Sequence, residues 1–215
     1  MKEVKDLKLI LKDFETIVKQ GDTWKHVTLD DVCEISSKLV DPRKPDFIDL
    51  VHVGGANIQS VTGKLILLKT SREEKLISGK FLFDQNMVLY SKIRPYLMKV
   101  ARPEFRGLCS ADIYPLLPKP NKILRDYLYH LLLSKNFTEY AIKGSARAGM
   151  PKVNREHLFA YNFWIPPQKE QKQIISKLDT LFEQTKKLEQ IYQRKLELLQ
   201  ELKQSVLQKA FAGEL

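Results

Sequence analysis

The sequence predicts an α+β fold in which a globular mixed-sheet domain is followed by one long C-terminal coiled-coil helix. Three observations lead to this prediction. Short aliphatic and β-branched runs, separated by Gly, Pro, Asn or Asp, occupy the middle of the chain, as expected of strands. A long stretch near the C-terminus has neither Gly nor Pro. That stretch uses about fifty of the 215 residues, so about 165 remain for one hydrophobic core.

The long helix is expected to run from Gln168 to about Ala212. Pro166 and Pro167 can start it without losing a helical hydrogen bond, and Gly213 can end it. Its apolar residues recur three and four positions apart, and this average spacing of about 3.5 is typical of a coiled coil. They are Leu178, Leu181, Leu188, Tyr192, Leu199, Leu202 and Val206. Such a helix, on the order of 65 Å long, needs a partner helix in a second copy or in another protein. A helix within a large α-helical core is the alternative.

The remaining residues divide into a lead-in and a sheet-rich domain. Residues 1–20 alternate charged and aliphatic side chains and are expected to form a short helix; residues 21–165 form the globular domain, and residues 166–215 the long helix. Strands, mostly antiparallel, are expected at Phe47–Val53, Lys64–Lys69, Met87–Lys92, Leu97–Ala101, Leu108–Tyr114 and Asn162–Ile165. Two further helices are expected, one capped by Ser71 and running to Leu76, and one capped by Asn121.

Positive charge is concentrated in one third of the chain. The net charge of the whole chain is +10, and residues 92–155 alone hold 13 Lys and Arg against 4 Asp and Glu, a net charge of +9. A localised basic field of this kind favours binding to a polyanion, most often nucleic acid. A basic surface without a ligand remains the alternative.

Two basic segments are the candidate DNA contacts. Gly144–Arg155 is a turn-rich segment without an acid, and Lys92–Lys99 places an aromatic residue among basic ones. Arg pairs with guanine and Asn with adenine through two hydrogen bonds each, and Lys and Arg neutralise phosphates. The candidate residues are Lys92, Arg94, Tyr96, Lys99, Arg147, Lys152, Asn154 and Arg155. A solvated structural loop is the alternative for either segment.

The sequence contains none of the common catalytic or metal-binding motifs. There is no Walker A loop, no G-x-G-x-x-G and no H-E-x-x-H, and the four His and two Cys are scattered. Cys33 and Cys109 are expected to be reduced core thiols, because the first residues do not resemble a secretory signal. With no apolar run long enough for a membrane span, we expect a cytoplasmic protein, and the scattered His and Cys predict no metal site.

One pattern suggests a different class of protein. Asp46, followed by Glu73, Glu74 and Lys75, superficially matches the carboxylates and lysine of metal-dependent nucleases. Such a site needs its acids close together around Mg²⁺. A metal-dependent restriction endonuclease and a stand-alone coiled-coil DNA-binding protein therefore remain alternative functions.

Several motifs together resemble the specificity (S) subunit of type I restriction–modification systems. The most specific is Ile165-Pro-Pro-Gln-Lys-Glu-Gln171, followed by the long helix and by Leu202-Lys-Gln-Ser-Val-Leu-Gln-Lys-Ala-Phe-Ala-Gly-Glu-Leu215. These look like the family's "P-PP-x-x-EQ" start of a conserved helix and its "LKQSLLQKAFSGEL" close. Four further segments are similar to parts of the family's target recognition domain: Trp24–Cys33, Asn86–Pro95, Cys109–Pro115 and Gly149–Asn154.

The resemblance implies a non-catalytic DNA-recognition subunit. In this family a methyltransferase (M) subunit binds S-adenosylmethionine and methylates adenine N6, and a restriction (R) subunit uses ATP and Mg²⁺. The usual S subunit has two target recognition domains and two conserved helices, whereas this chain resembles one of each. The resemblance therefore implies a half-length specificity subunit or a truncated one. A functional half-length form is expected to pair with itself as an antiparallel homodimer and to recognise a bipartite site on double-stranded DNA.

Overall fold

The structure, a computed structural model, describes residues 23–36, 38–145 and 150–213. The chain forms two compact units, residues 1–175 and 176–215. The expected α+β class is confirmed: short strands and helices are followed by one long helix, α8 (Gln168–Ala212). The predicted helix over residues 1–20 lies outside the described residues.

Most described strands belong to two larger sheets. The strands are β1 (Lys25–Thr28), β2 (Cys33–Ile35), β3 (Leu39–Val40), β4 (Val51–Val53), β5 (Lys69–Thr70), β6 (Lys80–Phe83), β7 (Val88–Ser91), β8 (Val100–Ala101), β9 (Gly107–Cys109), β10 (Ile113–Pro118) and β11 (Asn162–Ile165). One sheet has the order β3-β6-β9-β4-β5, another the order β2-β10-β7-β8, and β1 pairs with β11. The β4–β9 pair is parallel and the other pairs of described strands are antiparallel, as the predicted mixed sheet requires.

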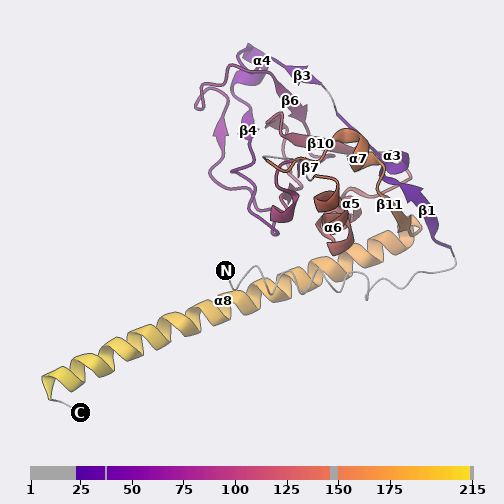
Figure 1. Cartoon of the computed structure of the whole chain (residues 1–215). Helices are drawn as coiled ribbons and strands as arrows, with labels where there is room; N and C mark the ends of the chain where they lie inside the picture. The colour runs from indigo at the N-terminus through magenta and orange to yellow at the C-terminus, as the bar shows by residue number, and fades with distance from the viewer. Residues whose placement is uncertain (1–22, 37, 146–149, 214–215) are drawn as a thin grey trace. The chain divides into compact units, whose positions relative to one another are not determined.

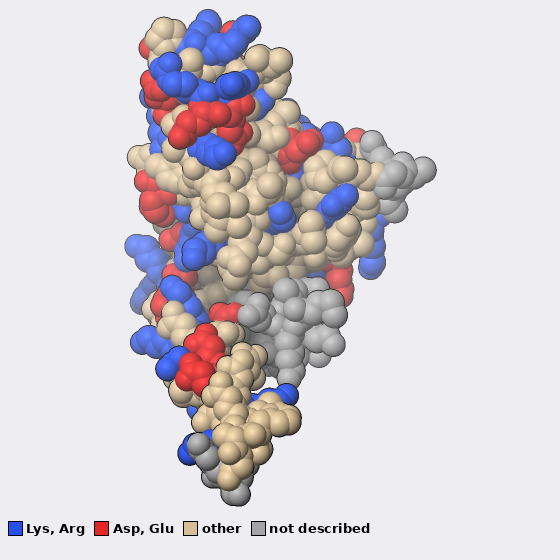
Figure 2. Space-filling view, turned by 90° about the vertical axis from the view of Figure 1, so that its left-hand side faces the viewer, with Lys and Arg blue, Asp and Glu red and all other residues tan. Residues whose placement is uncertain are grey.

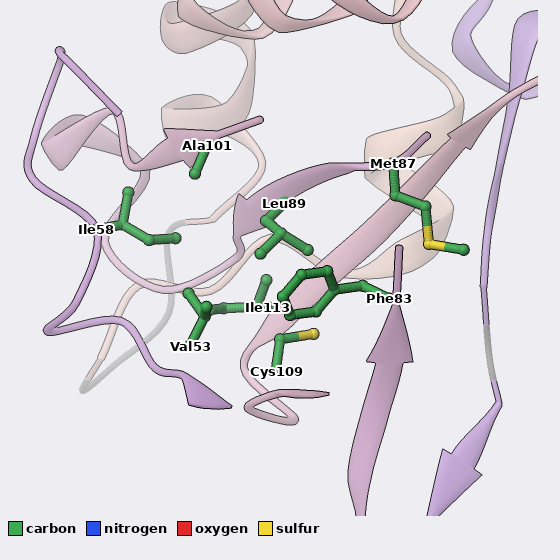
Figure 3. Packing of buried hydrophobic residues seen from close by; sticks show 8 residues of the cluster. All are labelled: Val53, Ile58, Phe83, Met87, Leu89, Ala101, Cys109 and Ile113. Carbon is green, nitrogen blue, oxygen red and sulfur yellow. The ribbon is translucent and has the colours of Figure 1, made fainter. Parts of the chain in front are cut away.

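The two larger sheets share one hydrophobic core (Figure 3). Leu89, Ala101 and Ile113 come from the four-stranded sheet, while Val53, Phe83 and Cys109 come from the five-stranded sheet. Cys33 and Cys109 are both buried free thiols, as predicted, and burial raises the pKa of each to about 12. A thiol that stays protonated behaves as a small apolar side chain in such a core.

Helices cover the four-stranded sheet. The short helices are α3 (Leu29–Val32), α4 (Pro45–Ile48), α5 (Arg125–Leu133), α6 (Lys135–Lys143), α7 (Arg155–Phe159) and the 3₁₀ turn η1 (Pro95–Leu97). Helices α5 and α6 lie side by side (Figure 1), and α5 packs against β7, β8 and β10. The ring of Phe137 on α6 lies 5.4 Å from that of Tyr90 on β7 and 5.1 Å from that of Tyr161, so aromatic edge contacts join helix and sheet.

The first and last described segments of the globular unit are joined. β1 and β11 pair from Lys25 opposite Ile165 to Thr28 opposite Asn162. Beyond this pair, the Trp24 indole N–H donates to Glu170 at 2.9 Å. The neighbouring side chain, Gln171, is 1% exposed; its oxygen accepts from the Leu124 N–H at 2.8 Å, and its amide nitrogen donates to the carbonyls of Lys122 and Pro166. The first two turns of α8 therefore belong to the globular unit.

Helix α8 has the predicted ends. Pro166 and Pro167 precede it, and the N–H groups of Glu170 and Gln171 donate to the Pro167 carbonyl. Gly213 follows it with φ +72°, the left-handed conformation that glycine adopts without strain at a helix C-terminus. Within the described part of the chain, no helix is long and apolar enough to cross a membrane.

Several local predictions are wrong. Only Lys69 of the predicted strand Lys64–Lys69 belongs to a strand, β5, and the predicted strand Leu108–Tyr114 is divided between β9 and β10. Of the predicted strand Leu97–Ala101, Leu97 ends η1 and only Val100–Ala101 is a strand. Residues Pro45–Ile48 form α4 rather than a strand, because Pro45 suits the first helical position, and only Val51–Val53 of the predicted run is a strand. Residues 71–76 form turns rather than a helix, with Lys75 at φ +51°. Asn121, at φ +61°, does not cap a helix: α5 begins at Arg125. Its N-cap residue, Leu124, donates its N–H to the distant Gln171, a contact that local pattern does not show.

Gln171→Ala should destabilise the globular unit. The substitution leaves the Leu124 N–H and the Lys122 and Pro166 carbonyls without their buried partner, which should cost roughly 2–4 kcal/mol. Urea unfolding measures the loss as a lower midpoint. Gln173→Ala removes an exposed glutamine two residues along the same helix and is the matched control, expected within about 0.5 kcal/mol of wild type. Equal midpoints for the two variants would contradict this role of Gln171.

Candidate nucleic-acid interface

The structure brings the two predicted basic segments together. Ile93 and Lys152 form an antiparallel bridge. On either side of it, the Arg94 N–H donates to the Pro151 carbonyl and the Val153 N–H to the Lys92 carbonyl, both at 2.9 Å. Although they lie more than fifty residues apart in sequence, the two segments run side by side as a short two-stranded ribbon.

The first segment is the loop of the β7–β8 hairpin. The Ser91 N–H donates to the Lys99 carbonyl at 3.0 Å and closes the base of the loop. At its tip, the residues on either side of η1, Arg94 and Met98, both adopt the left-handed conformation with φ +50°. That conformation costs a residue with a side chain roughly 1–2 kcal/mol. We call Arg94–Met98 the Arg94 turn. Such strain persists only where surrounding contacts hold the backbone in place.

The Arg94 turn is anchored on one side and exposed on the other. Pro95 is buried and Met98 is 5% exposed, and the Met98 carbonyl accepts from the Val61 N–H at 3.1 Å. Tyr96, in contrast, is 47% exposed, and Arg94 is exposed as well. With the residues that the structure describes, neither side chain forms an ion pair or a hydrogen bond. The backbone of the turn is thus held in place while these two side chains face solvent.

The same two segments also carry a cluster of cations close to one acid. We call Lys92, Lys152 and Arg155 the basic cluster. The ammonium groups of Lys92 and Lys152 each lie 3.8 Å from the same Asp112 carboxylate oxygen. Lys92 also donates to the Ala111 carbonyl, and its ammonium lies 5.0 Å from the centre of the Tyr114 ring. The Tyr114 hydroxyl donates to the Val153 carbonyl at 3.3 Å, which ties β10 to the second segment.

The cluster carries more positive charge than Asp112 offsets. Burial lowers the pKa of Lys92; the positive charges of Lys152 and Arg155 lower it further, while Asp112 raises it. Burial likewise raises the pKa of Tyr114, an effect that Arg155 opposes. Lys92, Lys152 and Arg155 therefore act on one small region, where a phosphate or another anion would relieve their mutual repulsion.

The other predicted contacts have different surroundings. The Lys99 ammonium donates to the Gly55 carbonyl at 2.5 Å. Asn154 caps α7: its side-chain oxygen accepts from the His157 N–H at 2.7 Å, so pairing with adenine through both amide atoms would require breaking the cap. Arg155 is the first residue of α7 and is exposed. Arg147 lies outside the described residues.

The basic field of residues 92–155 is only partly neutralised. Its four acids all form ion pairs: Glu104 with Arg125, Asp126 with Arg102, Glu139 with Lys135, and Asp112 with the basic cluster. Exposed cations without an ion pair to a described residue are Arg94, Arg106, Lys122, Lys143 and Arg155. Around α4, in contrast, ion pairs join Asp41 to Arg43 and Asp49 to Arg72, and acids and bases are mixed at that end of the face in Figure 2.

Sequence reasoning did not single out Asp112 or Tyr114 as part of the site. Both lie in the segment Cys109–Pro115, which was noted only as a family-like strand. The signal that could have found Asp112 is its isolation: it is one of only four acids in a region with 13 bases. Its proximity to Lys92 and Lys152 depends on the pairing of β7 with β10 and on the bridge at Ile93, which a linear pattern does not reveal.

The carboxylates of the nuclease-like pattern are engaged elsewhere. Glu73 accepts from the Thr70 N–H at 2.7 Å, and Glu74 lies 2.8 Å from the His52 ring nitrogen. Asp46 lies in the first turn of α4. Within the described ranges, no group of three or more His, Cys, Asp or Glu side chains could hold a metal ion.

Helix α8 exposes apolar side chains along its outer part. Of the predicted seam, Leu188, Tyr192, Leu199, Leu202 and Val206 are 45–62% exposed, whereas Leu178 is buried and Leu181 is half-buried. The exposed apolar surface is wider than the predicted seam. It also includes Ile191, Leu196, Leu198, Leu207 and Phe211. By the helical period these residues lie on both flanks of the seam, so one partner helix would leave part of this surface uncovered.

These features are those of a DNA-specificity domain, and comparison with known proteins establishes the family. The chain belongs to the family of type I restriction modification DNA specificity domains, which matches residues 21–200. It is 36% identical over 192 residues to the type I restriction enzyme EcoDI specificity subunit of Escherichia coli, covering 89% of this chain and 42% of that protein. It is 31% identical over 113 residues to the StySPI specificity subunit of Salmonella potsdam, covering 52% of this chain and 24% of that protein. The resemblance found in the sequence is confirmed.

Solved structures show the same fold. The HsdS subunit from Thermoanaerobacter tengcongensis matches with a TM-score of 0.62 and 19% identity, covering 100% of this chain and 52% of that one. A chain from a study of complex assembly and conformational transition of the type I R-M system matches with a TM-score of 0.70 and 17% identity, covering 99% and 54%. The chain thus spans about half the length of these relatives or less.

Asp112→Asn should lower the pKa of Lys92 further. The carboxylate is the group that raises this pKa, while burial and the other two cations lower it. NMR titration of the Lys92 ε-methylene group measures the change. Glu104→Gln removes an acid that pairs with Arg125 and does not act on Lys92; it is the control and should leave the pKa unchanged. An unchanged or higher Lys92 pKa in Asp112→Asn would contradict the described cluster.

Proposed function

We propose that this chain is the DNA-recognition subunit of a type I restriction–modification complex and that it carries out no catalysis itself. It would direct a methyltransferase subunit, which binds S-adenosylmethionine and methylates adenine N6, to a bipartite site on double-stranded DNA. A restriction subunit using ATP and Mg²⁺ would act on the same assembly. Family membership and the names of the relatives support this proposal.

The DNA-binding part of this proposal rests on the pairing of Lys92–Tyr96 with Met150–Arg155. This pairing places Lys92 and Lys152 beside Asp112, with the charge of Arg155 acting on Lys92, and leaves Arg94 and Tyr96 exposed on the same segment as Lys92. Lys and Arg contact phosphates, and a two-stranded ribbon can enter the major groove. The interface is therefore proposed to centre on these two segments, with Arg147, Lys152 and Arg155 as phosphate contacts.

Replacing Arg147, Lys152 and Arg155 together by Ala should weaken DNA binding and its dependence on salt. Each lost phosphate contact removes about one unit from the slope of log K against log salt, or about three units for the triple variant. Fluorescence anisotropy with the chain bound to its methyltransferase subunit measures both quantities. Lys44, Lys64 and Lys69 are exposed lysines outside the 92–155 region, so their triple Ala variant controls for net charge. A folded Arg147/Lys152/Arg155 variant with full affinity and slope would place the interface elsewhere.

The second part of the proposal concerns assembly. We propose that α8 pairs with α8 of a second copy as an antiparallel, two-fold symmetric homodimer and also contacts helices of the methyltransferase subunit. The exposed apolar residues on the seam and on both its flanks support more than one partner helix. In an isologous pair the same residues lie on both sides. An antiparallel pair would separate two identical recognition domains by a spacer, so that each reads one half-site.

Replacing Leu188 and Leu199 by Asp should give a monomer. The two substitutions place two charges in the apolar seam between the helices, which should destabilise the dimer by several kcal/mol. The control variant, Gln190→Asp with Gln204→Asp, adds the same charge. By the 3.6-residue period of the helix its two positions lie on the opposite side, so the control should remain dimeric. Analytical ultracentrifugation at micromolar concentration distinguishes the two. A wild-type monomer, with or without the methyltransferase subunit, would rule out the homodimer, and failure to co-purify with that subunit would favour a stand-alone DNA-binding protein.

A further inference from the structure

Lys92–Tyr96 and Met150–Val153 pair as a short two-stranded ribbon, the type of element that can enter the major groove. The two backbone segments lie side by side at the Ile93–Lys152 bridge, and each contributes side chains to the ribbon. The major groove of B-DNA is about 12 Å wide and admits a two-stranded ribbon, whereas the minor groove is only about 6 Å wide. A ribbon of this kind therefore fits the groove in which all four base pairs present distinct patterns.

The side chains of the ribbon separate into two sets by their surroundings. In the basic cluster, Lys92 and Lys152 lie beside Asp112, the Lys92 ammonium lies over the Tyr114 ring, and the charge of Arg155 acts on Lys92 and Tyr114. Arg94 and Tyr96 are on the Arg94 turn, exposed and without a polar partner among the described residues. Met150, 55% exposed, precedes the Pro151 carbonyl that accepts from the Arg94 N–H. The turn therefore offers one free guanidinium beside exposed apolar surface.

The Arg94 turn is also held rigid in an unfavourable backbone conformation. Hydrogen bonds from the Arg94 N–H to the Pro151 carbonyl and from the Val61 N–H to the Met98 carbonyl attach the turn to two other segments, and one from the Leu97 N–H to the Arg94 carbonyl closes it internally. Left-handed residues that carry side chains, here Arg94 and Met98, concentrate at functional sites. A turn ordered before binding loses less entropy when it meets its ligand. Phosphate contact needs no such ordering, whereas reading the edge of a base does.

From these observations we propose that the Arg94 turn enters the major groove and that Arg94 and Tyr96 determine sequence specificity, while Lys152 and Arg155 contact phosphates. The proposal rests on the DNA-recognition role proposed above. Arg94 would donate two hydrogen bonds to O6 and N7 of a guanine, and the Tyr96 ring would pack against the C5 methyl of a thymine. Both contacts lie on edges that only the major groove displays.

Binding measurements on two duplexes test this division of roles. The full chain is bound to its methyltransferase subunit, and wild-type methylation of a host genome first identifies the target. The probes are a 30-base-pair duplex with that target and one with the same bases shuffled. Arg94→Lys retains the charge but loses the double hydrogen bond, and Tyr96→Ala removes the ring. Each should reduce the ratio of target to shuffled affinity by about tenfold or more without changing the salt slope.

Matched variants make the test specific. Tyr96→Phe retains the ring and should keep wild-type discrimination. Lys152→Ala with Arg155→Ala should weaken both duplexes equally and reduce the salt slope by about two units. Arg94→Lys and Tyr96→Ala proteins that bind both duplexes as wild type does, or that weaken both equally, would overturn the proposal. So would Tyr96→Phe discriminating as poorly as Tyr96→Ala. Equal wild-type affinity for the two duplexes would instead contradict the DNA-recognition role itself.

Discussion

The hydrogen bonds of Gln171 are the contact on which the globular unit depends most. This buried amide joins the first turns of α8 to the backbone at Lys122 and Leu124, just before α5, and to the Pro166 carbonyl. The neighbouring Glu170 accepts a hydrogen bond from the indole N–H of Trp24, which lies at the other end of the domain in sequence. Because an unpaired buried amide is costly, these hydrogen bonds favour the arrangement in which the segments lie together. The Glu-Gln pair after the two prolines thus has a physical role: it makes the start of the helix part of the domain.

Within the globular unit, backbone pairing brings the residues of the candidate interface together. The bridge at Ile93 and Lys152 brings together cations from two segments, and Asp112 from β10 lies between two of them. The resulting excess of positive charge suits an anion without selecting among DNA sequences. Selectivity requires side chains held at defined positions, and the strained Arg94 turn provides such positions for Arg94 and Tyr96. In the proposed interface, affinity and specificity therefore come from different side chains a few residues apart.

Features that follow from periodicity and chain breakers were predictable from the sequence. Strand β11 and the ends of α8 follow from an aliphatic run, two prolines and a glycine, and both agree with the structure. Features that involve distant contacts were not predictable: α5 begins at Arg125 rather than near Asn121, and its N-cap residue Leu124 donates its N–H to the distant Gln171. The pairing that places Asp112 beside Lys92 and Lys152 depends likewise on sheet register. The width of the apolar surface on α8 was visible in the sequence, but the search for a 3.5-residue seam left out Ile191, Leu198 and Phe211.

This chain is proposed to supply the DNA sequence preference of a methyltransferase and to do so as two identical copies. Single-molecule sequencing of a host genome that expresses this chain and its methyltransferase subunit, with no other specificity subunit, tests it most directly. N6-methyladenine should appear at one interrupted palindrome with a constant unread gap, and should be absent when either protein is omitted. Methylation at two unrelated half-sites, or methylation with this chain alone, would contradict the claim.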